Sequence, residues 1–122
     1  MFGISTSGIV TVNRGDSFEL PVSLILGSVM SPTCYKLQNS DVLYLGIMEP
    51  NQPFETAIVR KMIRGSDVQD RCHPVFRFWP TDTSCLLPGK YYYQIKLETT
   101  DPESNKTDVE TIVDKTLFYI QE

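Results

Sequence analysis

Few side chains in this sequence of 122 residues have the type and spacing that catalysis requires. The single imidazole is that of His73, which precedes Pro74 and has beside it no serine or cysteine in the turn of an activated nucleophile. Carboxylates that could be paired as an acid and a base are Asp67 with Asp70 and Asp82 with Glu55. Acidic residues in loops are usually only solvated. The sequence therefore predicts a protein that is not an enzyme.

The soft and imidazole metal ligands of the chain are three cysteines and one histidine, namely Cys34, Cys72, Cys85 and His73. They complete a zinc site by number, but the adjacent Cys72 and His73 would point to opposite faces of an extended strand. An odd number of cysteines without CxxC spacing gives no complete disulfide framework, so at least one thiol stays free. We expect Cys34 and Cys85 to be small apolar core residues, with no metal and no cofactor.

Two short motifs match known recognition patterns, and each has a simpler explanation. Arg14-Gly15-Asp16 matches the integrin tripeptide, but it lies between two apolar stretches, where Gly15 can take the positive φ of a tight turn. Asn105-Lys106-Thr107 fits the glycosylation acceptor pattern, which matters only in a secretory pathway. The seven glycines are scattered along the chain and predict no phosphate-binding loop.

The balance of charges excludes two classes of partner. A formal charge of −4 and a pI near 4.9 argue against nucleic acid and against an anionic membrane surface, since both need a basic footprint. No apolar run approaches the roughly 20 residues that span a bilayer. Residues 1–6 lack the basic and apolar regions of a signal peptide. We expect one domain, residues 1–122, made and kept in the cytoplasm or assembled into a larger particle there.

The clearest structural signal is a Pro88-Gly89 turn followed by strict alternation of residue types. The residues predicted to face the core are Tyr91, Tyr93, Ile95 and Leu97, and those predicted to face water are Tyr92, Gln94, Lys96 and Glu98. This period of two is typical of a strand with one buried face.

Further strands are predicted along the whole chain, separated by turn signals at intervals of roughly ten residues. Their expected ranges are 8–12, 17–26, 33–37, 42–48, 56–63, 75–79 and 108–121. Strand 42–48 is expected to be central, and Pro21 is expected at an edge or a bulge because it cannot donate a ladder hydrogen bond. The polar stretch 64–72 predicts a long connection with at most one helical turn. The pattern predicts an all-β protein, a β-sandwich of about eight strands.

Aromatic side chains predicted on the wet faces are the candidates for a binding surface. An exposed ring beside a cation is favoured at protein interfaces, and it could also serve as a platform for a sugar. We favour the protein interface, and the residues chosen for it are Trp79, Tyr92, Arg77, Lys96 and Pro21.

Three runs of residues carry a resemblance to a known family, namely 9–20, 41–47 and 87–97. They resemble the small immunoglobulin-like domains of tailed-bacteriophage virion proteins, such as the N-terminal domain of baseplate upper proteins and related tail-fibre modules. The resemblance implies an immunoglobulin-like antiparallel β-sandwich. In such domains a tyrosine packs back across a corner and hydrogen-bonds to the backbone, and Tyr91 is the matching position.

Such baseplate proteins carry long further segments toward the receptor-binding part, whereas this sequence ends at Glu122. The resemblance therefore implies a non-enzymatic structural subunit of the virion, in the tail, baseplate, fibre attachment or head decoration, assembled in the host cytoplasm. Its expected partners are other virion proteins and copies of itself, with no nucleic acid and no membrane. The alternative is a carbohydrate-binding or host-adhesion module that uses exposed aromatic rings. A third class is a regulatory or inhibitor domain that binds a cellular enzyme.

Overall fold

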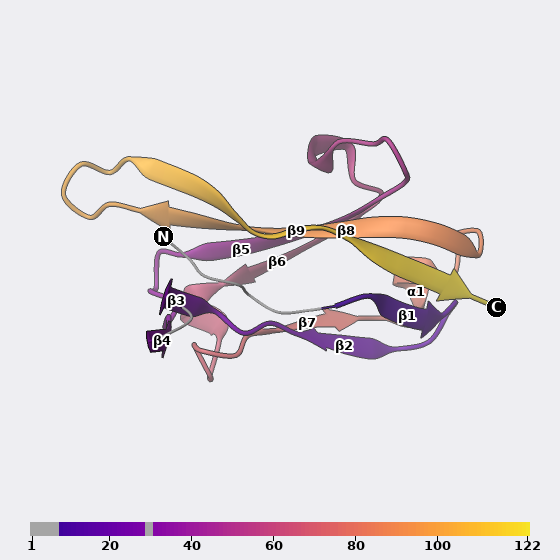
Figure 1. Ribbon diagram of the computed structural model, residues 1–122, viewed down its shortest axis with the longest axis horizontal. Helices are drawn as coiled ribbons and strands as arrows, with labels where there is room; N and C mark the ends of the chain where they lie inside the picture. Colours follow the sequence, from indigo (N-terminus) through magenta and orange to yellow (C-terminus); the bar gives the residue numbers. More distant parts are fainter. Residues whose placement is uncertain (1–7, 29–30) are drawn as a thin grey trace.

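The structure is a computed structural model that describes residues 8–28 and 31–122, with side chains described for 8–24 and from 33 onward (Figure 1). Its strands are β1 (Val10–Asn13), β2 (Phe18–Pro21), β3 (Ile25–Ser28), β4 (Ser31–Cys34), β5 (Val42–Met48), β6 (Val59–Arg64), β7 (Val75–Phe78), β8 (Gly89–Thr100) and β9 (Thr107–Gln121). The helical elements are the single turns η1 (Phe54–Thr56), η2 (Gly65–Asp67) and α1 (Pro80–Thr83). The all-β class predicted from the sequence is confirmed. Among the described residues, no helix is long and apolar enough to cross a bilayer.

The strands form one large sheet and two strand pairs. The large sheet has the order β1-β9-β8-β5-β6, and the pairs are β2-β7 and β3-β4. In Figure 1 the large sheet lies above the layer that contains β2 and β7. Pairing is antiparallel except between β1 and β9, which run parallel from Val10↔Phe118 to Asn13↔Gln121. This one parallel pair departs from the antiparallel arrangement that the resemblance implies, and local periodicity could not predict it, because periodicity does not report the relative direction of two strands.

The core lies between the large sheet and the β2–β7 pair. It is built from the alternate residues of facing strands, among them Leu20, Leu43, Leu45, Phe76, Phe78, Tyr93, Ile95, Leu97, Phe118 and Ile120. The rings of Phe18 and Phe78 are stacked with centroids 4.3 Å apart, and Tyr93 meets Phe118 edge-on at 6.1 Å. Each fully buried side chain of this size contributes about 1.5–3 kcal/mol relative to exposure.

The tyrosine strand has the alternation that its sequence predicted. Tyr91 and Tyr93 are buried, whereas Tyr92 and Lys96 are only partly covered. The Tyr91 hydroxyl donates a hydrogen bond to the Leu87 carbonyl oxygen at 2.7 Å, so the ring spans the turn that precedes β8. Burial of the ring, followed by the nearby charge of Glu49, raises the pKa of Tyr91.

Several predicted strand limits needed correction. The single strand expected over 17–26 is divided, because β2 ends at Pro21 and β3 begins at Ile25. Val22 and Leu24 still donate to the carbonyls of Pro74 and Cys72, so an irregular ladder continues between the two strands. The strand expected over 33–37 is β4, which spans 31–34, and the strand expected over 56–63 begins only at 59, because residues 54–56 form η1.

Two other predictions were confirmed. Strand β5 occupies the predicted range 42–48 and lies centrally, between β6 and β8. The helical turn allowed within 64–72 is η2. The polar residues 101–106 form the loop between β8 and β9, at the far left of Figure 1.

Candidate protein interface

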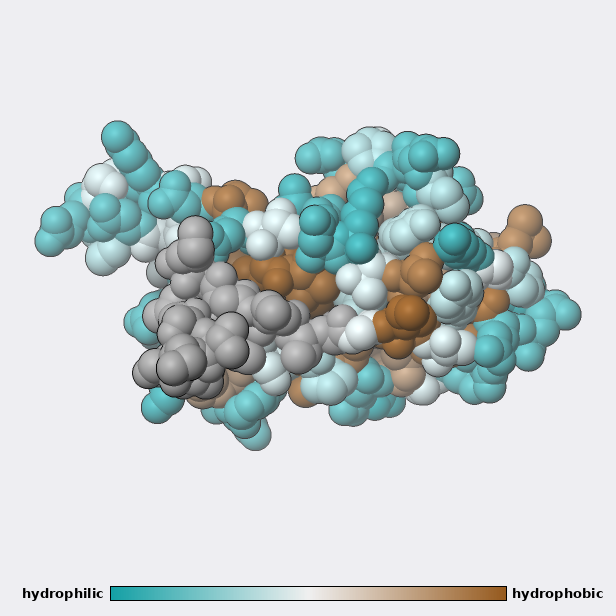
Figure 2. Space-filling view, in the orientation of Figure 1, coloured by the Kyte–Doolittle hydropathy of each residue, from teal (hydrophilic) through white to brown (hydrophobic). Residues whose placement is uncertain are grey.

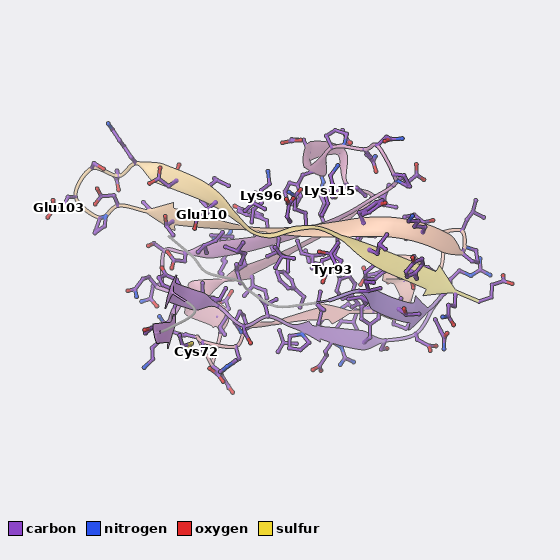
Figure 3. All side chains as sticks on the ribbon, viewed as in Figure 1. Cys72, Tyr93, Lys96, Glu103, Glu110 and Lys115 are labelled. Carbon is purple, nitrogen blue, oxygen red and sulfur yellow. A yellow bond between two sulfur atoms is a disulfide. The ribbon has the colours of Figure 1, made fainter. Side chains whose placement is uncertain are left out.

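The five predicted interface residues do not form one surface. Pro21, Arg77 and Trp79 lie on the outer side of the β2–β7 pair, with Pro21 exposed at the end of β2. Tyr92 and Lys96 lie on the outer side of the large sheet, opposite the core-facing tyrosine row. Figure 3 shows Lys96 on the upper side of this sheet and Tyr93 between the layers. The core therefore separates the two groups.

Trp79 is the most prominent ring on the β2–β7 side, with 54% of its surface exposed. The Arg77 guanidinium lies 4.7 Å from its ring centroid and also pairs with Glu19 at 2.9 Å. A cation stacked on an indole fixes the ring orientation and covers one of its faces. The sequence correctly placed this ring and this cation together on an exposed face.

The outer side of the large sheet is partly covered by the segment that contains η1, which the sequence reasoning missed. A Cβ on Gly46 would lie 2.9 Å from Cε2 of Phe54, so this ring rests directly on β5 where only glycine leaves room. The Lys96 ammonium lies 4.8 Å from the Phe54 ring centroid, and Lys115 donates to the Gln52 carbonyl at 3.3 Å. The Lys96 ammonium therefore already has an intramolecular partner, the Phe54 ring.

Exposed apolar side chains gather where β6 and β7 approach each other. We define this surface as the β6–β7 rim: strands β6 and β7 with Ile58 and Trp79 at their ends. Its exposed apolar residues are Ile58 (39% exposed), Met62 (50%), Val75 (42%) and Trp79 (54%). β6 is the last strand of its sheet, and in the described ranges no backbone hydrogen bond joins it to β7. Unpaired strand edges of this kind are templates for pairing with another chain.

Two clefts flank β6, so the surface of the rim is hollowed rather than flat. One, of about 330 Å³, lies between Met62 and Val75 and is also lined by Ile63, Arg64, Asp67 and Val68. The other, of about 320 Å³, lies at the start of β6 and is lined mainly by Tyr44, Phe54 and Arg60. Clefts on either side of an open strand can receive alternate side chains of an added strand.

An ion pair anchors the start of the rim to α1. The Lys61 ammonium lies 2.6 Å from a carboxylate oxygen of Asp82, and both side chains are only 19% exposed. The same oxygen accepts the backbone N–H of Trp79 at 2.7 Å. Asp82 therefore stabilises the junction of β6, Trp79 and α1. Glu55, its proposed acid–base partner, is not joined to it by any ion pair or hydrogen bond in the described part of the chain.

Two arginines of β6 are not neutralised. The Arg60 guanidinium donates to the backbone carbonyl of Glu55, and the Arg64 guanidinium makes no hydrogen bond or ion pair with the residues that the structure describes. Because residues two apart on a strand share a face, Arg60, Met62 and Arg64 present an apolar side chain between two cations. The rim is therefore apolar and basic in an acidic protein.

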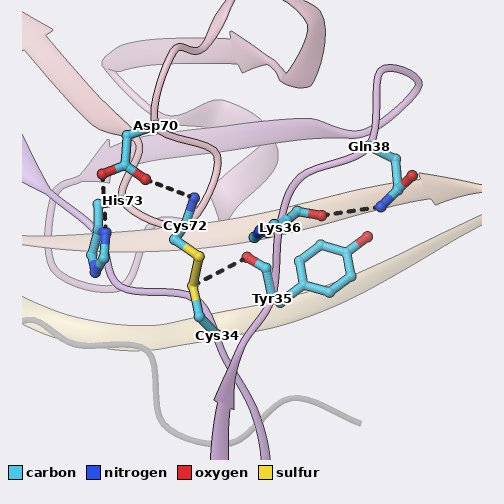
Figure 4. The surroundings of a disulfide bond; sticks show 7 residues. All are labelled: Cys34, Tyr35, Lys36, Gln38, Asp70, Cys72 and His73. Carbon is cyan, nitrogen blue, oxygen red and sulfur yellow. Dashed lines mark hydrogen bonds and ion pairs between the residues drawn. A yellow bond between two sulfur atoms is a disulfide. The ribbon is translucent and has the colours of Figure 1, made fainter.

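The cysteines are arranged differently from the prediction. Cys34 and Cys72 form a disulfide with Cα atoms 5.8 Å apart (Figure 4). Cys85 is an exposed free thiol. The expectation that Cys34 and Cys85 are core residues was wrong, while the expectation of a free thiol was correct. The pairing spans 38 positions of sequence. It depends on the fold bringing the end of β4 beside the loop before β7.

His73, next to Cys72, contacts the carboxylate of Asp70. Its Nδ1 lies 3.2 Å from an oxygen of Asp70, and both side chains are more than half exposed. Partial desolvation acts to raise the pKa of Asp70, but hydrogen bonds from His73 and from the Cys72 N–H outweigh it and lower that pKa. Within residues 8–28 and 31–122, no group of three or more His, Cys, Asp or Glu side chains could hold a metal ion.

A buried carboxylate organises the corner next to the disulfide. Asp41 is 2% exposed and accepts hydrogen bonds from the Tyr35 hydroxyl at 2.5 Å and from the Gln38 N–H at 2.8 Å. Burial, and then the contact with Asp41, strongly raises the pKa of Tyr35. A Cβ on Gly65 would lie 1.9 Å from the Gln38 carbonyl oxygen, so this corner admits no side chain there. Asp41, Tyr35, Gln38 and Gly65 therefore pack and hydrogen-bond to one another, and their role is to stabilise this corner of the fold.

The integrin-like tripeptide has the turn geometry that was predicted. Gly15 has a φ of 82°, and its N–H donates to Oγ1 of Thr83 at 2.9 Å. Arg14 pairs with Glu122 at 3.0 Å. The motif thus ties the β1–β2 turn to α1 and to the end of the chain.

Comparison with known protein families, with curated proteins and with solved structures found no match for this chain. The function is therefore inferred from the β6–β7 rim and the arrangement of the strands. The rim combines open backbone, exposed apolar side chains and unneutralised cations, a combination suited to binding another polypeptide.

Proposed function

We propose that this protein is a non-enzymatic structural subunit of a tailed-bacteriophage particle, with an immunoglobulin-like β-sandwich fold, and that it acts through protein–protein contacts. The observation that carries the proposal is the β6–β7 rim. Met62 and Val75 expose about half of their surface beside the unpaired outer edge of β6. A position at an interface would explain why such side chains are left open to solvent.

Two features support the immunoglobulin-like class. The order β9-β8-β5-β6 corresponds to the strands G, F, C and C′ of a variable-type domain, and the β2-β7 pair corresponds to B and E of the opposite sheet. The hydrogen bond from the Tyr91 hydroxyl to the Leu87 carbonyl has the geometry of a tyrosine corner before strand F. The domain lacks the tryptophan that antibody domains carry on strand C, here β5, and its disulfide joins other positions.

Charge and cysteine chemistry fit the proposed place in a virion. A net charge of −4 favours protein partners over nucleic acid. Disulfides persist on surfaces that meet an oxidising medium, virion surfaces included, and the bond between Cys34 and Cys72 would stabilise a corner of a particle protein outside the host cell. The partners proposed are other virion proteins and copies of this chain.

The test is incorporation into particles. Phage assembled with the wild-type chain should contain it by mass spectrometry, and cryo-electron microscopy should place its β6–β7 rim against a neighbouring subunit. Met62→Lys and Val75→Lys should lower incorporation at least about tenfold, because each buries an unpaired cation in an interface. Leu87→Lys is the matched control, since Leu87 is 76% exposed and lies outside the rim. Equal incorporation of all three variants, or particles without the protein, would contradict the proposal.

The exposure of Trp79 keeps a carbohydrate-binding or host-adhesion module as the second candidate. One free indole face could stack on a sugar, although Arg77 covers the other and Tyr92 lies on the opposite layer. A glycan-array signal that is lost in Trp79→Ala and kept in Tyr92→Ala would favour this candidate. Absence of any signal with the wild-type protein would remove it.

A further inference from the structure

We propose that the occupant of the β6–β7 rim is a second copy of this chain, which docks on it with its acidic β8–β9 arm. The arm is defined as residues 99–110, the end of β8, the loop and the start of β9. The proposal deepens the structural role proposed above by naming the partner, and it rests on that role only for the biological setting. The contact itself depends on three features of the arm and on the complementary chemistry of the rim.

The first feature is that the arm extends past its neighbouring strands. Pairing between β8 and β9 continues to Thr100↔Thr107, whereas the ladder between β5 and β8 ends at Val42↔Glu98. On the other side, β1 pairs with β9 only from Phe118 onward. Within the described ranges, both edges of the arm therefore lack a strand partner, and Figure 1 shows its tip beyond the rest of the sheet.

The second feature is the charge of the arm. It carries four carboxylates, on Asp101, Glu103, Asp108 and Glu110, against the single cation of Lys106. Every residue from 101 to 111 is exposed, and Figure 2 shows a mostly hydrophilic surface at this end of the molecule. Figure 3 places Glu103 at the tip and Glu110 along the arm. Glu103, Asp108 and Glu110 form no ion pair with the described residues.

The third feature is that the arm is already shaped for binding. The Asp101 carboxylate accepts the Glu103 N–H and the Ser104 hydroxyl, each at 3.0 Å. The backbone adds hydrogen bonds from Asp101 to Lys106 and from Asn105 back to Asp101, and Asn105 takes a φ of 58°. A loop that is ordered before it binds loses less conformational entropy on binding.

The rim offers the complementary chemistry. On β6, Arg60, Met62 and Arg64 share one face; on β9, Asp108 and Glu110 share one face, and Val109, 60% exposed, points to the opposite face. In a strand added along β6, the two carboxylates can therefore lie on the face of Arg60 and Arg64, which lack acidic partners, while Val109 points to the opposite face, toward Ile63 and Val75 in the cleft beside β6. The open edges of the arm and of β6 can then exchange backbone hydrogen bonds.

The geometry also sets the kind of assembly. Arm and rim are different surfaces, so two copies can close as a reciprocal two-fold pair, or successive copies can form a ring or an open chain through heterologous contacts. Each copy offers one arm and one rim, which lets repeated modest contacts become a stable assembly.

The test uses the full chain in sedimentation-velocity and light-scattering experiments across a concentration series. Wild type should self-associate, and more weakly at about 500 mM than at about 50 mM salt, because salt screens exposed charges. The arm variant Asp108→Lys/Glu110→Lys and the rim variant Arg60→Glu/Arg64→Glu should each weaken self-association at least about tenfold, since each places like charges opposite one another. Mixed together, the two variants should associate with each other.

The control is Asp16→Lys/Glu49→Lys, which makes the same change in net charge at exposed positions outside the arm and the rim. It should self-associate like wild type, and circular dichroism should show that all variants are folded. Monomers at every concentration, equal effects of control and arm variants, or no association in the mixture would overturn the proposal.

The outcomes separate this proposal from the structural role. Monomers in solution that still enter particles through the rim would refute arm docking and leave the virion role standing. Charge-swap association in solution by a chain that no particle contains would support arm docking and refute the virion role.

Discussion

The two halves of the β8–β9 hairpin are one continuous ladder, yet they are stabilised in different ways. In the half that contains Tyr91, every second residue of β8 from Tyr91 to Leu97 is buried against the β2–β7 layer. In the other half, from residue 101 to 111, every residue is exposed, and the loop is held by its own hydrogen bonds around Asp101. Regular strand geometry therefore does not require a core behind it, and a strand pair that lacks one is available to a partner.

The largest effect is expected at the centre of the buried half. Tyr93→Ala should lower the free energy of unfolding by about 3–5 kcal/mol, because it removes a ring that is fully buried against Phe118 and leaves a cavity. Urea denaturation followed by tryptophan fluorescence measures this. Val109→Ala, in the exposed half, is the matched control and should change the value by less than about 0.5 kcal/mol. Similar losses for both would mean that the halves do not differ as described.

A smaller effect is expected where the buried half meets its turn. Tyr91→Phe removes only the hydroxyl that donates to the Leu87 carbonyl at 2.7 Å. It should cost about 1 kcal/mol in the free energy of unfolding, the usual net value of one intramolecular hydrogen bond. Tyr92→Phe, on the other face of the strand, should be neutral. A neutral Tyr91→Phe would show that the corner hydrogen bond does not stabilise the fold.

The smallest global effect is expected in the arm itself. Asp101→Ala should leave the thermal midpoint nearly unchanged and should speed amide hydrogen exchange at Asn105 and Glu103, because the carboxylate no longer holds the loop. Asp108→Ala is the control, since its side chain has no hydrogen bond within the described residues. Unchanged exchange in Asp101→Ala would indicate that the backbone alone fixes the arm.

Acid should reproduce that local effect. Hydrogen bonds from the Glu103 N–H and the Ser104 hydroxyl lower the pKa of Asp101. A group whose pKa is lower in the folded state stabilises it fully above its ordinary value, about 3.9 for aspartate, and loses that contribution as pH falls through the lowered pKa. Proton NMR of the Glu103 and Asn105 amides should therefore show the loop opening below about pH 4. A loop unchanged down to full protonation of Asp101 would argue against this account.

Parts of this fold could be predicted from sequence because they depend on neighbours along the chain. The alternation in 91–97, the Gly15 turn and the central strand 42–48 were predicted correctly, since residue period and turn chemistry are local properties. The limits of 17–26 were not, because Pro21 ends the regular ladder and the pairing of the following residues depends on the loop before β7.

The candidate site was predictable only in part. The residue types expected at an interface were identified, and Trp79 with Arg77 is exposed as a pair. Lys96 was expected to be available and instead lies over Phe54. The rim itself was missed, because no sequence pattern shows that β6 ends its sheet beside β7.

By itself, the sequence determined that the chain would be β-rich, which faces of its strands would be buried, and that its net charge would be acidic. Only the tertiary structure decided that Cys34 meets Cys72, that β1 runs parallel to β9, and that the basic β6 lies at a sheet edge while the acidic arm extends free. The reason is physical. Burial pattern and turn formation depend on interactions over a few residues, whereas partners distant in sequence are selected by packing of the whole chain.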